Sequence, residues 1–126
     1  MLILIMVKKT LILGASPNPE RYSYKATLML SEKGHEVFPV GLRKGKIGTH
    51  EILVNQPVLE DIHTVTLYVG PKNQLAYYDY MLQTIQPQRI IFNPGTENET
   101  LMTLAQQNGI ETETACTLVL LSLNDY

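Results

Sequence analysis

The sequence predicts an α/β protein with a Rossmann-like, doubly wound parallel sheet, three layers (α/β/α) and the strand order 3-2-1-4-5. Short apolar runs alternate with helix-like stretches along the whole chain, which is typical of parallel strands joined by helices. A turn of small residues, Gly14-Ala15-Ser16, follows the first run and precedes a helix-like stretch. The 126 residues are enough for one domain, 1–126, with a single core.

Five short apolar runs are expected to form the sheet. The connections between them are short and contain helix-like or turn-forming residues, which favours a parallel sheet covered on both faces. Right-handed crossovers in such a sheet place a ligand at the carboxyl ends of the strands. In chain order the runs are Thr10–Leu13, Glu36–Val40, Thr64–Val69, Arg89–Phe92 and Ile110–Thr114.

Helices are expected in three of the stretches between these strands, because each ends at a glycine or proline that stops helices. The middle stretch places four residues on one face at helical spacing, from Leu75 to Ile85. A single helical turn is expected at Val58–Asp61 and at most a short strand near Ile52–Val54. The three helical stretches are Ser23–Lys33, Lys72–Ile85 and Asn98–Asn108.

Composition excludes several classes of function. Ten basic and twelve acidic residues give a net charge of −2, which argues against nucleic acid as a partner. The single cysteine, Cys116, excludes an internal disulfide and suits the cytoplasm. No zinc-type cluster of cysteine and histidine is present in the sequence, so no metal site is expected.

The first seven residues, Met1–Val7, are all apolar. The run is too short to span a bilayer, and Lys8-Lys9 end it. It also lacks the basic segment and the cleavage site of a signal peptide, so no membrane contact is expected. The run is interpreted as a strand extension or as a surface covered by a partner, either a second copy of the chain or another protein.

The turn after the first strand is the strongest candidate for ligand binding. Gly14 and Ala15 leave little side chain in the way, so backbone N–H groups can approach an anion at the helix N-terminus. Ser16 adds a hydroxyl, and Arg21 adds a charged, bidentate contact. The predicted phosphate site is completed by Pro17 and Ser23. An ordinary strand–helix turn, which also needs small residues, is the alternative.

The end of the second strand is basic. No acidic residue occurs between Val37 and Lys46, where NAD-binding proteins place the acid that binds the ribose diol. The cations there suit a phosphate on the ribose instead, whereas a solvated surface loop is the alternative interpretation. The residues assigned to the site are Val40, Gly41, Arg43, Lys44 and Lys46.

The segment after the fourth strand lies at the same predicted edge of the sheet. Asn93 is expected to meet the ligand, and Gly95 to bring the backbone close to it. The alternative is a turn and a helix cap, with Thr96 or Asn98 as the capping residue. No catalytic residue is assigned, since Cys116 has no adjacent histidine or basic residue to lower its pKa.

Together these residues resemble the small stand-alone CoA-binding domain family, whose fold is like that of the CoA-binding domain of the succinyl-CoA synthetase α subunit. The resemblance covers about residues 9–117. Its strongest part is Gly14-Ala15-Ser16 followed by Arg21-Tyr22-Ser23-Tyr24, where family members carry Gly-Ala-Ser and then Arg-Pro-Ser-Tyr. Phe92–Glu99 corresponds to the family's Gln-x-Gly-x-x-Asn-Glu segment, and Cys116 to the cysteine of Asp-Arg-Cys.

The resemblance implies that the first turn holds the pyrophosphate of CoA and that the loop after the second strand lies near the 3′-phosphorylated adenosine. The sequence departs from the family pattern at three places. This chain has Val40-Gly41-Leu42 where the family has Val-Asn-Pro, and Tyr68-Val69 where the family has Phe-Arg. It has Thr114-Ala115 where the family has Asp-Arg. Tyr68 is included in the predicted site on this basis.

The predicted function is therefore non-catalytic binding of CoA or an acyl-CoA as a small-molecule nucleotide ligand. The alternative is an NADP-dependent oxidoreductase or a small-molecule transferase that uses the same cleft. A dinucleotide fingerprint needs three glycines where this turn has one, but Arg43 and Lys44 suit the 2′-phosphate of NADP. A third hypothesis is a subunit without ligand that contacts proteins through its apolar N-terminus.

Overall fold

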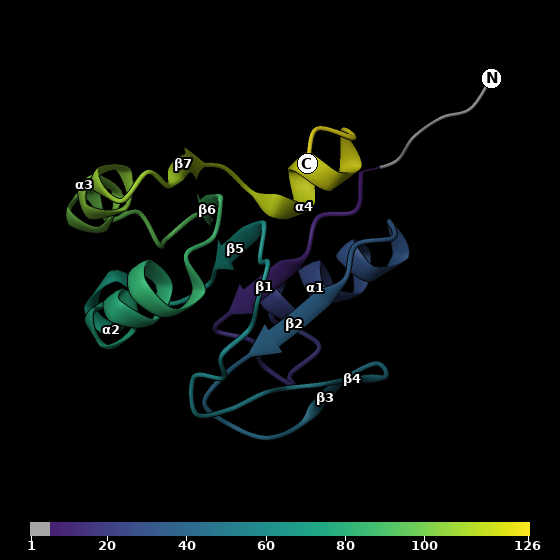
Figure 1. The fold of residues 1–126 in the computed structure, drawn as a ribbon. Helices are drawn as coiled ribbons and strands as arrows, with labels where there is room; N and C mark the ends of the chain where they lie inside the picture. Colours follow the sequence, from purple (N-terminus) through teal and green to yellow (C-terminus); the bar gives the residue numbers. More distant parts are fainter. Residues whose placement is uncertain (1–5) are drawn as a thin grey trace.

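A five-stranded parallel sheet lies at the centre of the structure, and helices pack on both of its faces (Figure 1). The structure is a computed structural model that describes residues 6–126. Neighbouring strands are all parallel. The predicted α/β, Rossmann-like fold is thereby confirmed. Along the chain the sheet consists of β1 (Thr10–Leu13), β2 (Val37–Val40), β5 (Thr64–Leu67), β6 (Arg89–Phe92) and β7 (Glu111–Thr114).

The structure corrects the predicted strand order, 3-2-1-4-5. The observed order is β2-β1-β5-β6-β7, so the five strands counted along the chain follow the order 2-1-3-4-5. All four residues of β5 are buried, which suits a central strand and not the sheet edge that the prediction assigned to it. On the outer side of β2, Leu53 lies beside Val40 instead, and the two residues form one isolated parallel bridge. The strand order therefore reverses between β1 and β5, and such a reversal is where doubly wound folds bind ligands.

Alternating side chains of the strands divide the core into two layers. On one face, Leu11, Val65 and Ile90 pack with η2 (Tyr80–Ile85) and α3 (Glu99–Gln107). On the other face, Ile12 and Ile91 pack with Leu30 of α1 (Tyr22–Glu32) and Leu121 of α4 (Thr117–Ser122). No helix was predicted for the segment that forms α4. The outer strand β7 is partly exposed.

The predicted helix Lys72–Ile85 is broken into three turns of different kinds. These are α2 (Pro71–Gln74), the 3₁₀ turn η1 (Leu75–Tyr77) and the π-helical η2. Leu82 and Ile85 of the expected apolar face are buried, but the face does not continue along the segment, because the number of residues per turn changes. Leu75 is 72% exposed, whereas Tyr80 and Met81 are buried.

The long connection between β2 and β5 also differs from the prediction. The single helical turn expected at Val58–Asp61 is not formed, and Asp61 has a positive φ of 59°. The connection contains a small antiparallel hairpin of β3 (Lys46–Ile47) and β4 (His50–Glu51). Its return segment runs beside β2, so the hairpin lies next to the carboxyl end of that strand.

Candidate functional site

The turn after β1 is held tightly against its neighbours. Gly14 has a φ of +96°, and a Cβ atom there would lie 2.9 Å from the carbonyl carbon of Tyr68, so only glycine fits. The backbone N–H groups of Gly14 and Ala15 both donate to the carbonyl oxygen of Val40, at 3.0 and 2.9 Å. Both N–H groups therefore fix the turn to β2, so the N–H of Ala15 is not free for the anion that it was expected to bind.

The N-terminus of α1, a few residues later, is open. Its N-cap is Arg21, whose exposed side chain makes no capping hydrogen bond. Among residues 6–126, no acceptor bonds the backbone N–H groups of Tyr22 and Ser23. Unbonded N–H groups at the positive end of a helix, here one of eleven residues, are groups of the kind that bind anions in proteins. Ser16 lies beside it and accepts a hydrogen bond from the N–H of Asn18 at 3.1 Å.

The loop after β2 packs directly on this turn. A Cβ atom at Gly41 would lie 2.3 Å from the carbonyl oxygen of Ala15. A Cβ atom at Gly45 would lie 2.9 Å from Cβ of Pro17. The two glycines therefore allow the loop and the turn to meet along one seam, which brings together two groups of predicted site residues that are far apart in sequence.

A hollow of about 420 Å³ lies beside this seam, and we call it the hairpin hollow. It is closed on one side by the hydrogen bond from the N–H of Ile52 to the carbonyl oxygen of Gly45, at 2.9 Å. Two of the predicted basic residues line it, whereas Arg43 does not. The lining residues are Lys44, Gly45, Lys46, Glu51, Ile52, Leu53 and Val54.

Sequence reasoning missed five of these residues, Gly45, Glu51, Ile52, Leu53 and Val54. The signals were present, because Gly48 is a turn residue and Ile52–Val54 is an apolar triplet. What the sequence pattern does not reveal is that β3 and β4 pair, which brings Glu51 back opposite Lys46. The strand end that was predicted to be free of acidic residues therefore has a carboxylate nearby.

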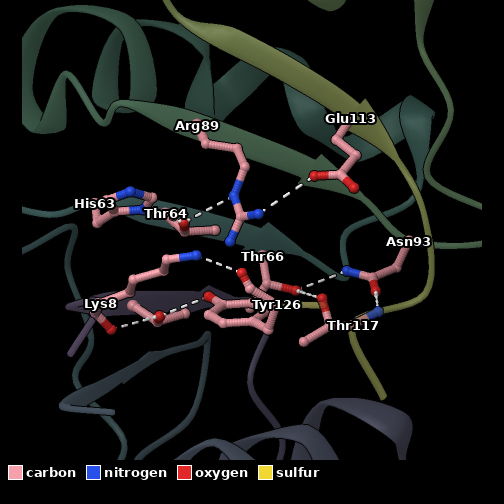
Figure 2. Close-up of polar contacts among 10 residues, drawn as sticks. Lys8, His63, Thr64, Thr66, Arg89, Asn93, Glu113, Thr117 and Tyr126 are labelled. Carbon is pink, nitrogen blue, oxygen red and sulfur yellow. Dashed lines mark hydrogen bonds and ion pairs between the residues drawn. The ribbon is translucent and has the colours of Figure 1, made fainter. Parts of the chain in front are cut away.

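The structure gives Asn93 a different role from the predicted one. The side chain is 2% exposed. Its amide nitrogen donates to Thr66 Oγ1 at 2.7 Å and to the carbonyl oxygen of Leu67 at 3.0 Å, while its amide oxygen accepts from the N–H of Thr117 at 2.9 Å (Figure 2). Asn93 thus clamps β5, β6 and α4 together, and it does not face the ligand side of the turn.

Gly95 is exposed at the same edge of the sheet, with a φ of +90°. Its N–H donates to the Glu97 carboxylate at 2.7 Å. The alternative interpretation of this segment as a helix cap is confirmed for Asn98, whose Oδ1 accepts from the N–H of Leu101 at 3.1 Å. Thr96 does not cap the helix, since its hydroxyl donates to the carbonyl oxygen of Asn93 at 2.7 Å.

Tyr68 follows β5 at the point where the strand order reverses. Its ring packs on the side of the sheet covered by α1 and α4, and its buried hydroxyl has no hydrogen-bond partner among residues 6–126. Burial raises the pKa of this phenol far above its ordinary value. Its backbone touches Gly14, so Tyr68 is part of the frame of the site.

A second polar cluster lies at the opposite, amino-terminal edge of the sheet (Figure 2). Arg89 is 7% exposed. Its Nε–H donates to Thr64 Oγ1 at 3.0 Å, its Nη1 pairs with the Glu113 carboxylate at 3.3 Å, and its guanidinium lies 4.7 Å from the ring centre of Tyr126. Lys8 donates to the carbonyl oxygen of Tyr126. Apart from Arg89 Nη2, which has no hydrogen-bond partner within residues 6–126, these groups bind one another, so the cluster stabilises the chain.

No group of three histidine, cysteine, aspartate or glutamate side chains in residues 6–126 is placed to hold a metal ion. Likewise, none of the helices within this range is long and apolar enough to cross a bilayer.

The chain belongs to the CoA binding domain family, because the model of that family matches residues 8–122. The predicted family is thereby confirmed, and CoA binding in general is supported. No functionally curated protein matches the chain.

Solved structures agree with the fold. The crystal structure of an uncharacterized protein is 49% identical, has a TM-score of 0.93 and aligns over 97% of this chain and 100% of its own. A hypothetical protein from Pyrococcus horikoshii OT3 is 24% identical, with a TM-score of 0.80 and coverage of 90% and 80%. A protein from Thermus thermophilus is 18% identical, with a TM-score of 0.82 and coverage of 95% and 91%. The last two show similarity of fold alone.

Proposed function

We propose that this chain binds CoA or an acyl-CoA without catalysing a reaction on it. Membership of the CoA binding domain family supports CoA as the ligand. The observation that carries the proposal is the seam at which the turn after β1 meets the loop after β2, made possible by Gly41 and Gly45. The turn leads into the N-terminus of α1, and the loop leads into the lysine-lined hairpin hollow. CoA carries anionic groups at two separate places, its pyrophosphate and its 3′-phosphate, and the seam offers positive groups at two adjacent places.

In this proposal the pyrophosphate lies at the start of α1. Arg21 supplies a charged contact, and the N–H groups of Tyr22 and Ser23 supply backbone donors. The 3′-phosphate lies near Lys44 and Lys46 in the hairpin hollow. The apolar residues of the hollow, Ile52–Val54, suit the faces of the adenine ring.

The positions of the histidines support binding without catalysis. His35 and His63 belong to the amino-terminal edge, near Lys8 and Arg89, and a general base there is on the wrong side of the sheet. His50 bonds the Ser31 hydroxyl at 3.1 Å and does not line the hollow. NADP is the alternative ligand, and it differs from CoA in carrying the phosphate on the 2′ rather than the 3′ position of the ribose.

The protein-contact hypothesis concerns the apolar N-terminus, Met1–Val7. Within the described range, Met6 and Val7 are 70% and 58% exposed. Residues 1–5 lie outside the described residues, so a second copy or another protein as the partner of this segment stays a proposal.

Isothermal titration calorimetry with CoA, NAD and NADP tests the proposed function. We expect CoA to bind and NAD to bind much more weakly. Arg21→Ala should weaken CoA binding by about 10- to 100-fold, since a hydrogen bond to a charged group contributes about 1.5–3 kcal/mol. Lys33→Ala is the matched control, because it removes one positive charge just beyond the far end of α1. Absence of CoA binding at millimolar concentration would contradict the proposal.

A further inference from the structure

A carboxylate shares the hairpin hollow with the two lysines. Glu51 of β4 lies directly opposite Lys46 of β3 in the antiparallel register, and both side chains are exposed and line the hollow. Lysine does not neutralise it, because the one ion pair among residues 6–126 joins Arg89 to Glu113 at the other edge of the sheet. The hollow therefore presents separate positive and negative groups.

A carboxylate is an unexpected neighbour for a phosphate, since two negative groups repel each other. A carboxylate only accepts hydrogen bonds, and a ribose hydroxyl can donate one to it. In dinucleotide-binding α/β proteins, an acid near the end of the second strand bonds the ribose in this way and excludes a phosphate from that hydroxyl. Here the second strand ends without such an acid, and Glu51 lies on the hairpin that follows the strand, opposite Lys46.

We infer that Glu51 determines which ribose hydroxyl may carry the phosphate in the bound nucleotide. The inference rests on the proposed function. Glu51 accepts a hydrogen bond from the free 2′-hydroxyl, while Lys44 and Lys46 bind the 3′-phosphate. A 2′-phosphate would bring two anions together at Glu51, so the hollow accepts 3′-phosphorylated adenosine, as in CoA, and rejects the 2′-phosphorylated form, as in NADP.

Two isomeric ligands test this inference without the rest of CoA. Adenosine 3′,5′-bisphosphate and adenosine 2′,5′-bisphosphate have the same composition and charge, so calorimetry on the full chain compares only the position of the phosphate. The wild-type chain should bind the 3′ isomer at least about tenfold more tightly, as expected for one hydrogen bond to a charged group. Glu51→Gln should reduce this preference to about twofold or less, mainly because the 2′ isomer binds better.

The decisive measurement is the ratio of the affinities for the 3′ and 2′ isomers, rather than the affinity for either isomer alone. Removing a negative charge tightens binding of any phosphate, so equal gains for both isomers in Glu51→Gln would overturn the inference. Equal binding of the isomers by the wild type, or CoA binding without binding of either bisphosphate, would also overturn it. Glu32→Gln, which removes the same charge at the far end of α1, should leave the preference unchanged. If the wild type binds neither CoA nor the bisphosphates, the proposed function fails and the inference fails with it.

Discussion

The two edges of the parallel sheet use their cations in opposite ways. At the amino-terminal edge, Arg89 is buried, and it bonds Thr64, pairs with Glu113 and lies against Tyr126. At the carboxyl-terminal edge, the four cations of the predicted site are exposed, and none of them forms an ion pair within residues 6–126. They are Arg21, Arg43, Lys44 and Lys46.

This difference between buried, bonded cations and exposed, unpaired cations indicates which edge of the sheet can bind an anionic ligand. A buried cation has already exchanged water for protein partners, and removing those partners is costly. An exposed cation contributes little to the stability of the fold, so it is available to a ligand phosphate. The comparison predicts that mutations at the amino-terminal edge change stability, whereas mutations at the carboxyl edge change binding.

The largest expected effect is on stability at the amino-terminal edge. Arg89→Ala removes the hydrogen bond to Thr64, the ion pair with Glu113 and the contact with the Tyr126 ring, and it leaves a cavity. We expect it to lower the free energy of unfolding by about 3 kcal/mol or more, measured by urea denaturation at pH 7. Arg43→Ala, which removes the same charge from the exposed loop, should change it by less than about 0.5 kcal/mol. Similar losses in both variants would break the comparison between the two edges.

A smaller effect on the stability of the fold is expected when the pH is lowered. Burial first, and then the positive charges of Lys8 and Arg89, lower the pKa values of His35 and His63 below their ordinary value of 6.5. Glu111 acts in the opposite direction on His63. The unfolded chain therefore binds protons more readily than the folded chain, so stability is fully present above about pH 6.5 and decreases as the pH falls below it.

The melting temperature between pH 7.5 and pH 5 measures this dependence. The double variant His35→Gln, His63→Gln should be less sensitive to acid than the wild type. His50→Gln is the matched control, because His50 lies on the hairpin, where its ring bonds the Ser31 hydroxyl. An unchanged pH profile in the double variant would show that other groups cause the acid sensitivity.

The smallest expected effect concerns the exposed lysines and sharpens the comparison at the carboxyl edge. Lys44→Ala with Lys46→Ala should reduce the preference for CoA over 3′-dephospho-CoA by up to about fivefold per lysine, since exposed ion pairs contribute about 0.2–1 kcal/mol each. The preference of the wild type should also decrease with added salt. Arg43→Ala should have less effect, because Arg43 lies outside the hairpin hollow. Calorimetry on both ligands checks each variant.

Local patterns in the sequence predicted the strands and the helices α1 and α3 well, because apolar periodicity and stop residues act over short distances. They did not predict that β5 lies beside β1, since strand order depends on contacts between distant segments. The break within residues 71–85 was missed for a related reason. Helical spacing assumes a constant number of residues per turn, and the segment changes from α to 3₁₀ to π geometry.

The same distinction applies to the candidate site. The turn at Gly14 and the lysines were visible in the sequence because their residue types suit a phosphate. Asn93 was misinterpreted because an amide after a strand suits a ligand and an internal clamp equally well, and only its burial distinguishes the two. Glu51 was overlooked because its position depends on the pairing of β3 with β4.

The hydrogen bond between Thr10 and Tyr126 has a consequence for the order in which the chain folds. The two hydroxyls are 2.6 Å apart, yet the residues are separated by 116 positions. Contacts between such distant residues form only after the intervening chain has been brought together. We therefore expect β1, β5 and α4 to be in place before the hydroxyl of Tyr126 bonds that of Thr10. We expect a contact that closes this late to be absent from the folding transition state, so it should slow unfolding without accelerating folding.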